Sequence, residues 1–161
     1  MNFALLIAPL VGFVAILFAV YLVFHDLLVK SKGSPKMVEI HEAIKTGANT
    51  YLALQFSVAA LFVGGITVIL SYVLGVSIAL SFTLGAVLSG LSAYVGMRVS
   101  IYMNVRTAHA ANCSFNESLD IATKSGTVVG LSLTGLGLIG VGLLYFIVDN
   151  PLLLLGMGFG A

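Results

Sequence analysis

Residues 46–97 read TGANTYLALQFSVAALFVGGITVILSYVLGVSIALSFTLGAVLSGLSAYVGM and contain no charged side chain. A helix needs about 20 apolar residues to cross a hydrocarbon layer roughly 30 Å thick. At 1.5 Å per residue a single helix over this stretch would be about 78 Å long, so the stretch must hold two membrane spans. Leu74-Gly75-Val76-Ser77 is the best place for a short turn. The sequence therefore predicts spans over residues 50–73 and 78–97.

Two further charge-free runs predict the remaining spans, over residues 2–24 and 125–148. The first run is longer than the 7–15 apolar residues of a signal peptide, and no Lys or Arg precedes it, so we expect it to be retained as a span. Asp149-Asn150-Pro151 is a strong stop signal for the last helix. Residues 152–161 are apolar but too short to cross, and we interpret them as the truncated start of a fifth span.

Composition points to the same class of protein. The chain has 161 residues, of which 60% are hydrophobic and 8% charged, which is far from the composition of a water-soluble domain. The formal net charge of +1 gives no indication of a nucleic-acid partner. No strand-like alternation appears, and backbone groups in lipid must be satisfied within a segment. We therefore predict an all-α, polytopic membrane helical bundle, a single domain over residues 1–161 whose immediate partner is the lipid bilayer.

The positive charges predict the orientation of the bundle. All seven Lys and Arg residues lie in two segments, residues 25–49 and 98–124, and none lies at the amino terminus or in the other two connections. The positive-inside rule therefore places both segments in the cytoplasm and the amino terminus outside.

Both segments also contain signals for helix starts. Ser34-Pro35 is typical of an N-cap followed by a first-turn proline, so the second helix is expected to begin before its membrane span. Ser114 and Glu117 have the spacing of a capping box, which predicts the same for the fourth helix.

Small residues repeat at helical spacing on two predicted spans. Such stripes let neighbouring helices approach backbone to backbone. We expect both to be assembly surfaces. They include Gly85 and Ser89 in the third span and Gly126 and Gly130 in the fourth.

Motifs that would carry chemistry are incomplete. His41-Glu42 begins like the zinc-protease motif H-E-x-x-H, but Lys45 occupies the place of the second histidine. Residues 135–140 match G-x-G-x-x-G, yet they lie within a membrane helix and lack the acidic residue about 20 positions later. We therefore assign no catalytic, cofactor-binding or metal-binding residue. No ionisable side chain lies within any predicted span, which argues against a proteolipid ring subunit of a rotary ATPase, a protein that needs a membrane carboxylate.

Several residue strings resemble one known family, the membrane-integral, ion-pumping inorganic pyrophosphatases. The most specific is residues 104–111, NVRTAHAA, which is similar to the family's N-V-R-T-A-x-A-A segment. The other strings follow in order and at matching spacing from Glu39 onward. They are residues 43–56, 85–97, 129–138 and 156–161.

The resemblance implies a larger enzyme that hydrolyses magnesium pyrophosphate and moves protons or sodium ions outward, and that works as a homodimer. Magnesium is the cofactor it implies for the parent protein, with potassium an open question. The family's acidic motifs come after the point that corresponds to Ala161. The chain is therefore expected to be an amino-terminal scaffold that packs against the remaining helices of the pump. It is expected in the plasma membrane of a prokaryote, or in an acidic organelle of a eukaryote.

Two residues are expected to make structural contacts with the later cytoplasmic part, namely Asn104 and Arg106. An exposed, solvated arginine is the alternative for Arg106. The alternative for the whole chain is a complete small membrane protein that assembles with a partner and catalyses nothing.

Overall fold

The computed structural model describes the backbone of residues 3–148 and 151–161, and the side chains of residues 7–146 and 151–161. These residues form helices and no strand, and four of the helices are long and apolar enough to cross a membrane. The prediction of an all-α membrane bundle is thereby confirmed. The elements are α1 (Phe3–Leu22), a π-helix η1 (Val23–Leu27), α2 (Pro35–Val73), α3 (Val76–Ala111), α4 (Phe115–Val148) and α5 (Pro151–Gly160).

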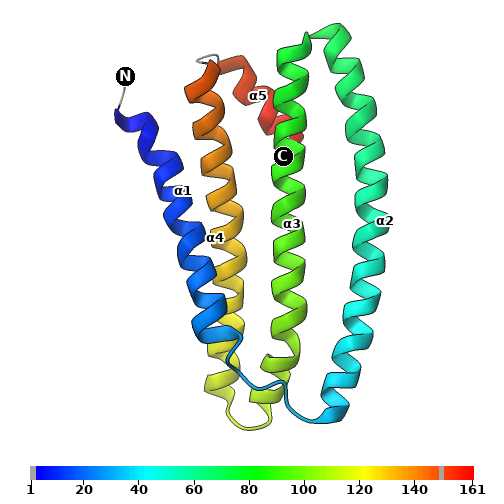
Figure 1. The fold of residues 1–161 in the computed structure, drawn as a ribbon, viewed down its shortest axis with the longest axis vertical. Coiled ribbons are helices and arrows are strands. Elements are labelled where there is room, and N and C mark those ends of the chain that lie inside the picture. The colour runs from blue at the N-terminus through cyan, green and yellow to red at the C-terminus, as the bar shows by residue number, and fades with distance from the viewer. Residues whose placement is uncertain (1–2, 149–150) are drawn as a thin grey trace.

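The four long helices stand side by side in the order α1, α4, α3, α2 (Figure 1). The short helix α5 returns from the end of α4 and packs along α3. Apolar side chains of α1, η1, α3 and α4 form one buried cluster, in which Leu27, Ile121 and Val128 are fully enclosed. Helices α1, α3 and α4 thus make the packed part of the bundle, whereas α2 lies at one edge.

The turn between α2 and α3 falls at the predicted break. Helix α2 ends at Val73 and α3 begins at Val76. Gly75 has a φ of 98°, a conformation that residues with a Cβ rarely adopt. The glycine therefore permits the tight reversal that turns one uncharged stretch into two antiparallel helices.

Helices α2 and α4 both begin directly after their predicted N-cap residues, but the predicted capping box of α4 is incomplete. The Ser34 hydroxyl accepts a hydrogen bond from the Met37 amide at 3.4 Å, and the Ser114 hydroxyl accepts one from the Glu117 amide at 3.4 Å. The Glu117 carboxylate, however, binds Lys30 at 2.8 Å, so the return bond of a capping box is replaced by a contact between distant segments.

The structure tests the predicted end of the first span but not that of the fourth. The regular helix of the first span ends at Leu22 rather than Phe24, because the backbone widens into the π-turn η1. The predicted stop at Asp149-Asn150 lies outside the described residues.

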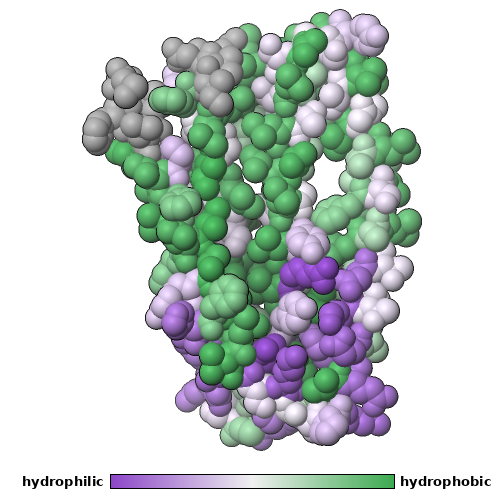
Figure 2. Space-filling view, in the orientation of Figure 1, coloured by the Kyte–Doolittle hydropathy of each residue, from purple (hydrophilic) through white to green (hydrophobic). Residues whose placement is uncertain are grey.

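Polar side chains collect at one end of the bundle (Figure 2). We call this the polar end and define it as residues 25–49 and 98–124. It contains the end of η1, the α1–α2 linker, the first turns of α2, the end of α3, the α3–α4 turn and the first turns of α4. Its cytoplasmic location remains a prediction.

Candidate functional site

Arg106 is the best-buried charged residue of the polar end, with 4% of its surface exposed. It projects from α3 toward the α1–α2 linker. Its Nε donates to the Lys30 carbonyl at 3.0 Å, and its two terminal nitrogens donate to the carbonyls of Tyr102 at 2.7 Å and Leu28 at 3.4 Å. Burial lowers the pKa of Arg106, but a guanidinium remains charged in proteins. The side chain therefore binds the linker to α3 through its backbone.

Ion pairs add a second set of connections between these elements. Lys124 on α4 binds Asp120 on the same helix and Asp26 on η1, each at 3.0 Å. Hydrogen bonds to Asp120 and Asp26 raise the pKa of Lys124. Lys30 of the linker binds Glu117 at the start of α4. These side chains are partly exposed, so each pair contributes little alone. Together they connect η1 and the α1–α2 linker to α4.

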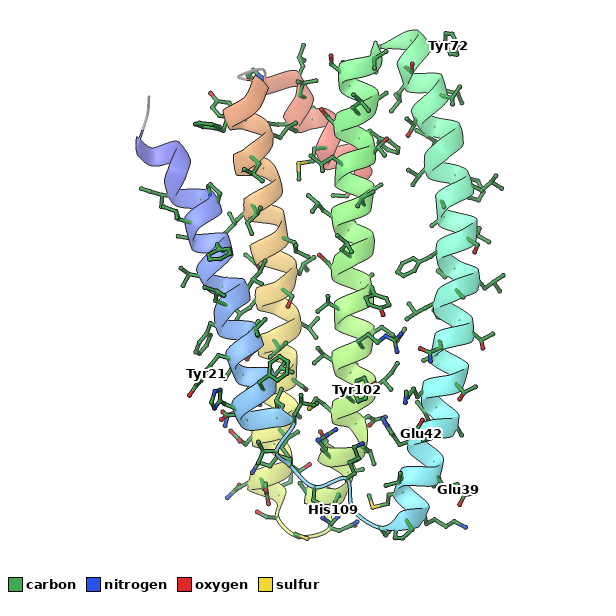
Figure 3. All side chains as sticks on the ribbon, in the orientation of Figure 1. Tyr21, Glu39, Glu42, Tyr72, Tyr102 and His109 are labelled. Carbon is green, nitrogen blue, oxygen red and sulfur yellow. The ribbon has the colours of Figure 1, made fainter. Side chains whose placement is uncertain are left out.

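A buried histidine lies where α2 meets α3. His41 is 2% exposed, and its ring centroid is 5.8 Å from that of Tyr102. Figure 3 labels Tyr102 on α3 and Glu42, the neighbour of His41 on α2. Its Nε2 has no hydrogen-bond partner in the part of the chain that the structure describes. Burial lowers the pKa of His41, which favours the neutral ring. Sequence reasoning considered this residue only as a failed zinc ligand, because nothing local signals its burial.

Asn104 lies two positions before Arg106, which places the two side chains on different faces of α3. It is exposed, and its side chain forms no hydrogen bond with another described residue. Asn104 lines two small cavities of about 160 and 340 Å³ beside α2 and α4. The alternative of a solvated arginine is wrong for Arg106, whose partners are inside this chain. Contact of either residue with a later part of the protein remains a prediction.

The two small-residue stripes differ in what they contact. Gly85 lies against α5, where an added Cβ would meet the carbonyl of Met157, and the Ser89 hydroxyl donates to the Ala161 carbonyl at 2.8 Å. In contrast, no described atom lies within 4 Å of a Cβ added to Gly126 or Gly130. The first stripe therefore packs within the chain, and the second faces outward.

The close approach of α1 to α4 was missed by sequence reasoning. It occurs at Gly12 and Gly135, because a Cβ on either glycine would meet the other's backbone carbonyl. The signal was present in the glycines of residues 135–140, which were interpreted as helix packing without a specified partner.

The polar end can position helices, and its geometry offers no metal site. Among the residues whose positions are described, no three His, Cys, Asp or Glu side chains come together in a way that would hold a metal ion. The buried charge is compensated by backbone carbonyls rather than left free for a substrate.

Comparisons with known proteins agree on one family. The model of the family described as inorganic H+ pyrophosphatase matches residues 13–161. The K(+)-insensitive pyrophosphate-energized proton pump of Methanosarcina mazei is 36% identical over 156 residues, which cover 96% of this chain and 23% of that protein. A putative K(+)-stimulated pyrophosphate-energized sodium pump of Bacteroides thetaiotaomicron is 35% identical over 150 residues, which cover 89% and 20%.

A second proton pump relative has the same partial coverage. The K(+)-insensitive pyrophosphate-energized proton pump 2 of Moorella thermoacetica is 34% identical, with 96% of this chain and 24% of that protein covered. The chain thus spans about a fifth to a quarter of the length of the curated relatives it matches. No solved structure matches it significantly.

Proposed function

This chain belongs to the inorganic H+ pyrophosphatase family, and we propose that it forms the amino-terminal scaffold of a membrane pump that couples pyrophosphate hydrolysis to ion transport. One observation carries this proposal. The match extends over nearly the whole chain but only about a fifth to a quarter of each relative.

The distribution of charge supports a scaffold role. Groups that carry ions across a membrane are ionisable side chains within the spans. The four predicted spans contain none, and the charged groups gather at the polar end, where they connect helices to one another. The carboxylates that hold magnesium pyrophosphate and conduct the ion therefore belong to the part of the pump outside these residues.

The substrate, the transported ion, the oligomeric state and the membrane of the parent pump are part of the same proposal. It takes magnesium pyrophosphate as substrate, moves protons or sodium ions outward and works as a homodimer. The polar end faces the cytoplasm and the amino terminus lies outside, as the positive-inside rule requires. The membrane is the plasma membrane in a prokaryote and an acidic organelle membrane in a eukaryote.

Ion uptake into sealed vesicles tests the proposal. Vesicles that hold the longer protein should take up protons or sodium ions when pyrophosphate and magnesium are added, and should stop when magnesium is chelated. Vesicles that hold only these 161 residues, at equal protein amount, should show neither uptake nor hydrolysis. Pyrophosphate-driven uptake by the 161 residues alone would overturn the assignment of a scaffold role, and a reading frame that ends at Ala161 would favour the small assembling protein.

A further inference from the structure

Helices α2 and α3 diverge between two points of contact. Near the turn, the hydroxyls of Thr67 and Thr83 are 2.8 Å apart. At the polar end, His41 packs against Tyr102. Between these contacts lies a groove of about 640 Å³, and Figure 2 shows an opening between the two helices. Its walls include Phe56, Ala60 and Val63 of α2 and Ala86, Gly90 and Ala93 of α3. Gly160 of α5 also lines it.

The groove is apolar and unfilled. No described atom lies within 4 Å of a Cβ added to Gly64 or Gly90, one on each wall. A second helix is 10–12 Å across, so it would have to separate one of the two contacts to enter fully. A single acyl chain is narrow and flexible enough to lie between them.

Cationic side chains lie beyond the polar end of the groove. Arg98 follows the wall residue Ala93 on α3, and its guanidinium lies 5.0 Å from the ring centroid of Tyr94. It forms no ion pair with any residue that the structure describes. Lys45 on α2 binds Glu42 at 2.9 Å, which raises the pKa of Lys45, and the positive charge of Arg98 offsets a small part of this rise. The Lys45 ammonium also lies 5.8 Å from the ring centroid of Tyr102 on α3.

An unsatisfied amide lies next to these cations. The Oδ1 atom of Asn49 is buried and has no hydrogen-bond partner among the described residues. Asn49 is one turn from Lys45 on α2, in the direction of the groove. Because Oδ1 accepts hydrogen bonds, a phosphate cannot satisfy it, and its partner would have to be a donor such as a head-group hydroxyl. The case for an anionic lipid therefore rests on the two cations and the apolar groove between α2 and α3.

We propose that the α2–α3 groove binds an anionic phospholipid, with the phosphate between Arg98 and Lys45 and one acyl chain along Gly90. Basic pockets between membrane helices are suited to anionic head groups. A guanidinium can bind two phosphate oxygens at once. Arg98 immediately follows the predicted span over residues 78–97, so it lies at the depth of a lipid phosphate. This proposal does not depend on the proposed function of the chain.

Native mass spectrometry of the purified 161-residue chain tests the head-group site. Phosphatidylglycerol should bind more tightly than phosphatidylcholine with the same acyl chains. Arg98→Gln should weaken phosphatidylglycerol binding about fivefold, the factor expected for one cation near a lipid surface. Lys36→Gln makes the same charge change on an exposed residue away from the groove and should have no such effect. Glu42→Gln should strengthen binding, because it releases Lys45.

A second pair of variants tests the acyl-chain site. Gly90→Phe should fill the groove and weaken binding while both cations remain. Gly130→Phe adds the same ring at another open glycine, on α4, and should bind lipid normally. Gly64→Phe places the ring in the groove from the opposite wall. It replaces Gly90→Phe in this test if Gly90→Phe loses its helix content. Glycerol phosphate, which has the head-group charge and no acyl chains, should not compete.

Four outcomes of the binding measurements would overturn the proposal. They are equal binding of the two lipids, equal losses in Arg98→Gln and Lys36→Gln, full binding by every groove-filling variant that folds, and competition by glycerol phosphate. Phosphatidylglycerol with a photoreactive acyl chain should label α2 and α3 near Ala60. Labelling of other helices alone, or a protein segment crosslinked into the groove in the longer pump, would also overturn it.

Discussion

Replacing Arg106 by methionine should destabilise the bundle by about 2–4 kcal/mol. The substitution keeps an unbranched apolar stem but removes every donor. The Lys30 carbonyl, which accepts from Nε at 3.0 Å, loses a hydrogen bond to a charged group, a loss that costs about 1.5–3 kcal/mol. The Leu28 carbonyl accepts at 3.4 Å and adds a smaller amount. The Tyr102 carbonyl adds little, because it also belongs to the hydrogen-bond ladder of α3.

Thermal or denaturant unfolding of the purified chain in mild detergent, followed by far-UV circular dichroism, measures this loss. Arg98→Met is the matched control, since Arg98 also lies on α3 but donates no hydrogen bond to a described carbonyl, and it should cost under about 1 kcal/mol. Arg106→Lys should recover only part of the loss, because one ammonium cannot reproduce the planar guanidinium fork. If Arg106→Met unfolds like the original chain, or if the two methionine variants lose equal stability, the linker is not held by Arg106.

Three further predictions concern other contacts. Gly85→Val should displace α5, and limited proteolysis should then cut the chain faster after α4. Gly126→Val should leave the proteolysis pattern unchanged, because of these two glycines Gly85 alone faces another described helix. Stability should fall as the pH drops below about 6.5, because burial lowers the pKa of His41 from 6.5 and the unfolded chain then binds more protons; in His41→Leu this part of the pH dependence of the melting temperature should disappear. Thr67→Val and Thr83→Val should each cost about 0.6 kcal/mol, and a double-mutant cycle should show that the two losses are not additive.

The helices and their turn were predictable because their signals are local. Charge-free runs specify where a helix must cross, and Gly75 specifies where the chain can reverse. The caps at Ser34 and Ser114 act within one turn of their own residues. Each of these features depends on neighbours in sequence, so a single sequence contains the information.

The order of the helices was not predictable in the same way. Four apolar helices can stand side by side in several orders, and each order leaves the backbone hydrogen bonds satisfied within the helices, as the lipid environment demands. The order α1, α4, α3, α2 results from contacts such as Gly12 with Gly135. The role of Arg106 was hidden for a similar reason, because two of its three acceptors belong to a linker 76 and 78 residues earlier in the chain.

The two stripes of small residues differ in whether another described helix covers them. Gly85 and Gly126 have the same chemistry and spacing in sequence, and both were predicted to be assembly surfaces. Gly85 is occupied by α5, whereas the face around Gly126 contacts no described helix. Small residues on a lipid-facing helix gain nothing from the hydrophobic effect, because lipid tails are as apolar as leucine, but they allow close approach of a partner helix. We predict that a later helix of the longer protein packs on the outward face of α4. Gly130→Leu should then destabilise the longer protein in an unfolding measurement and leave the stability of this chain unchanged.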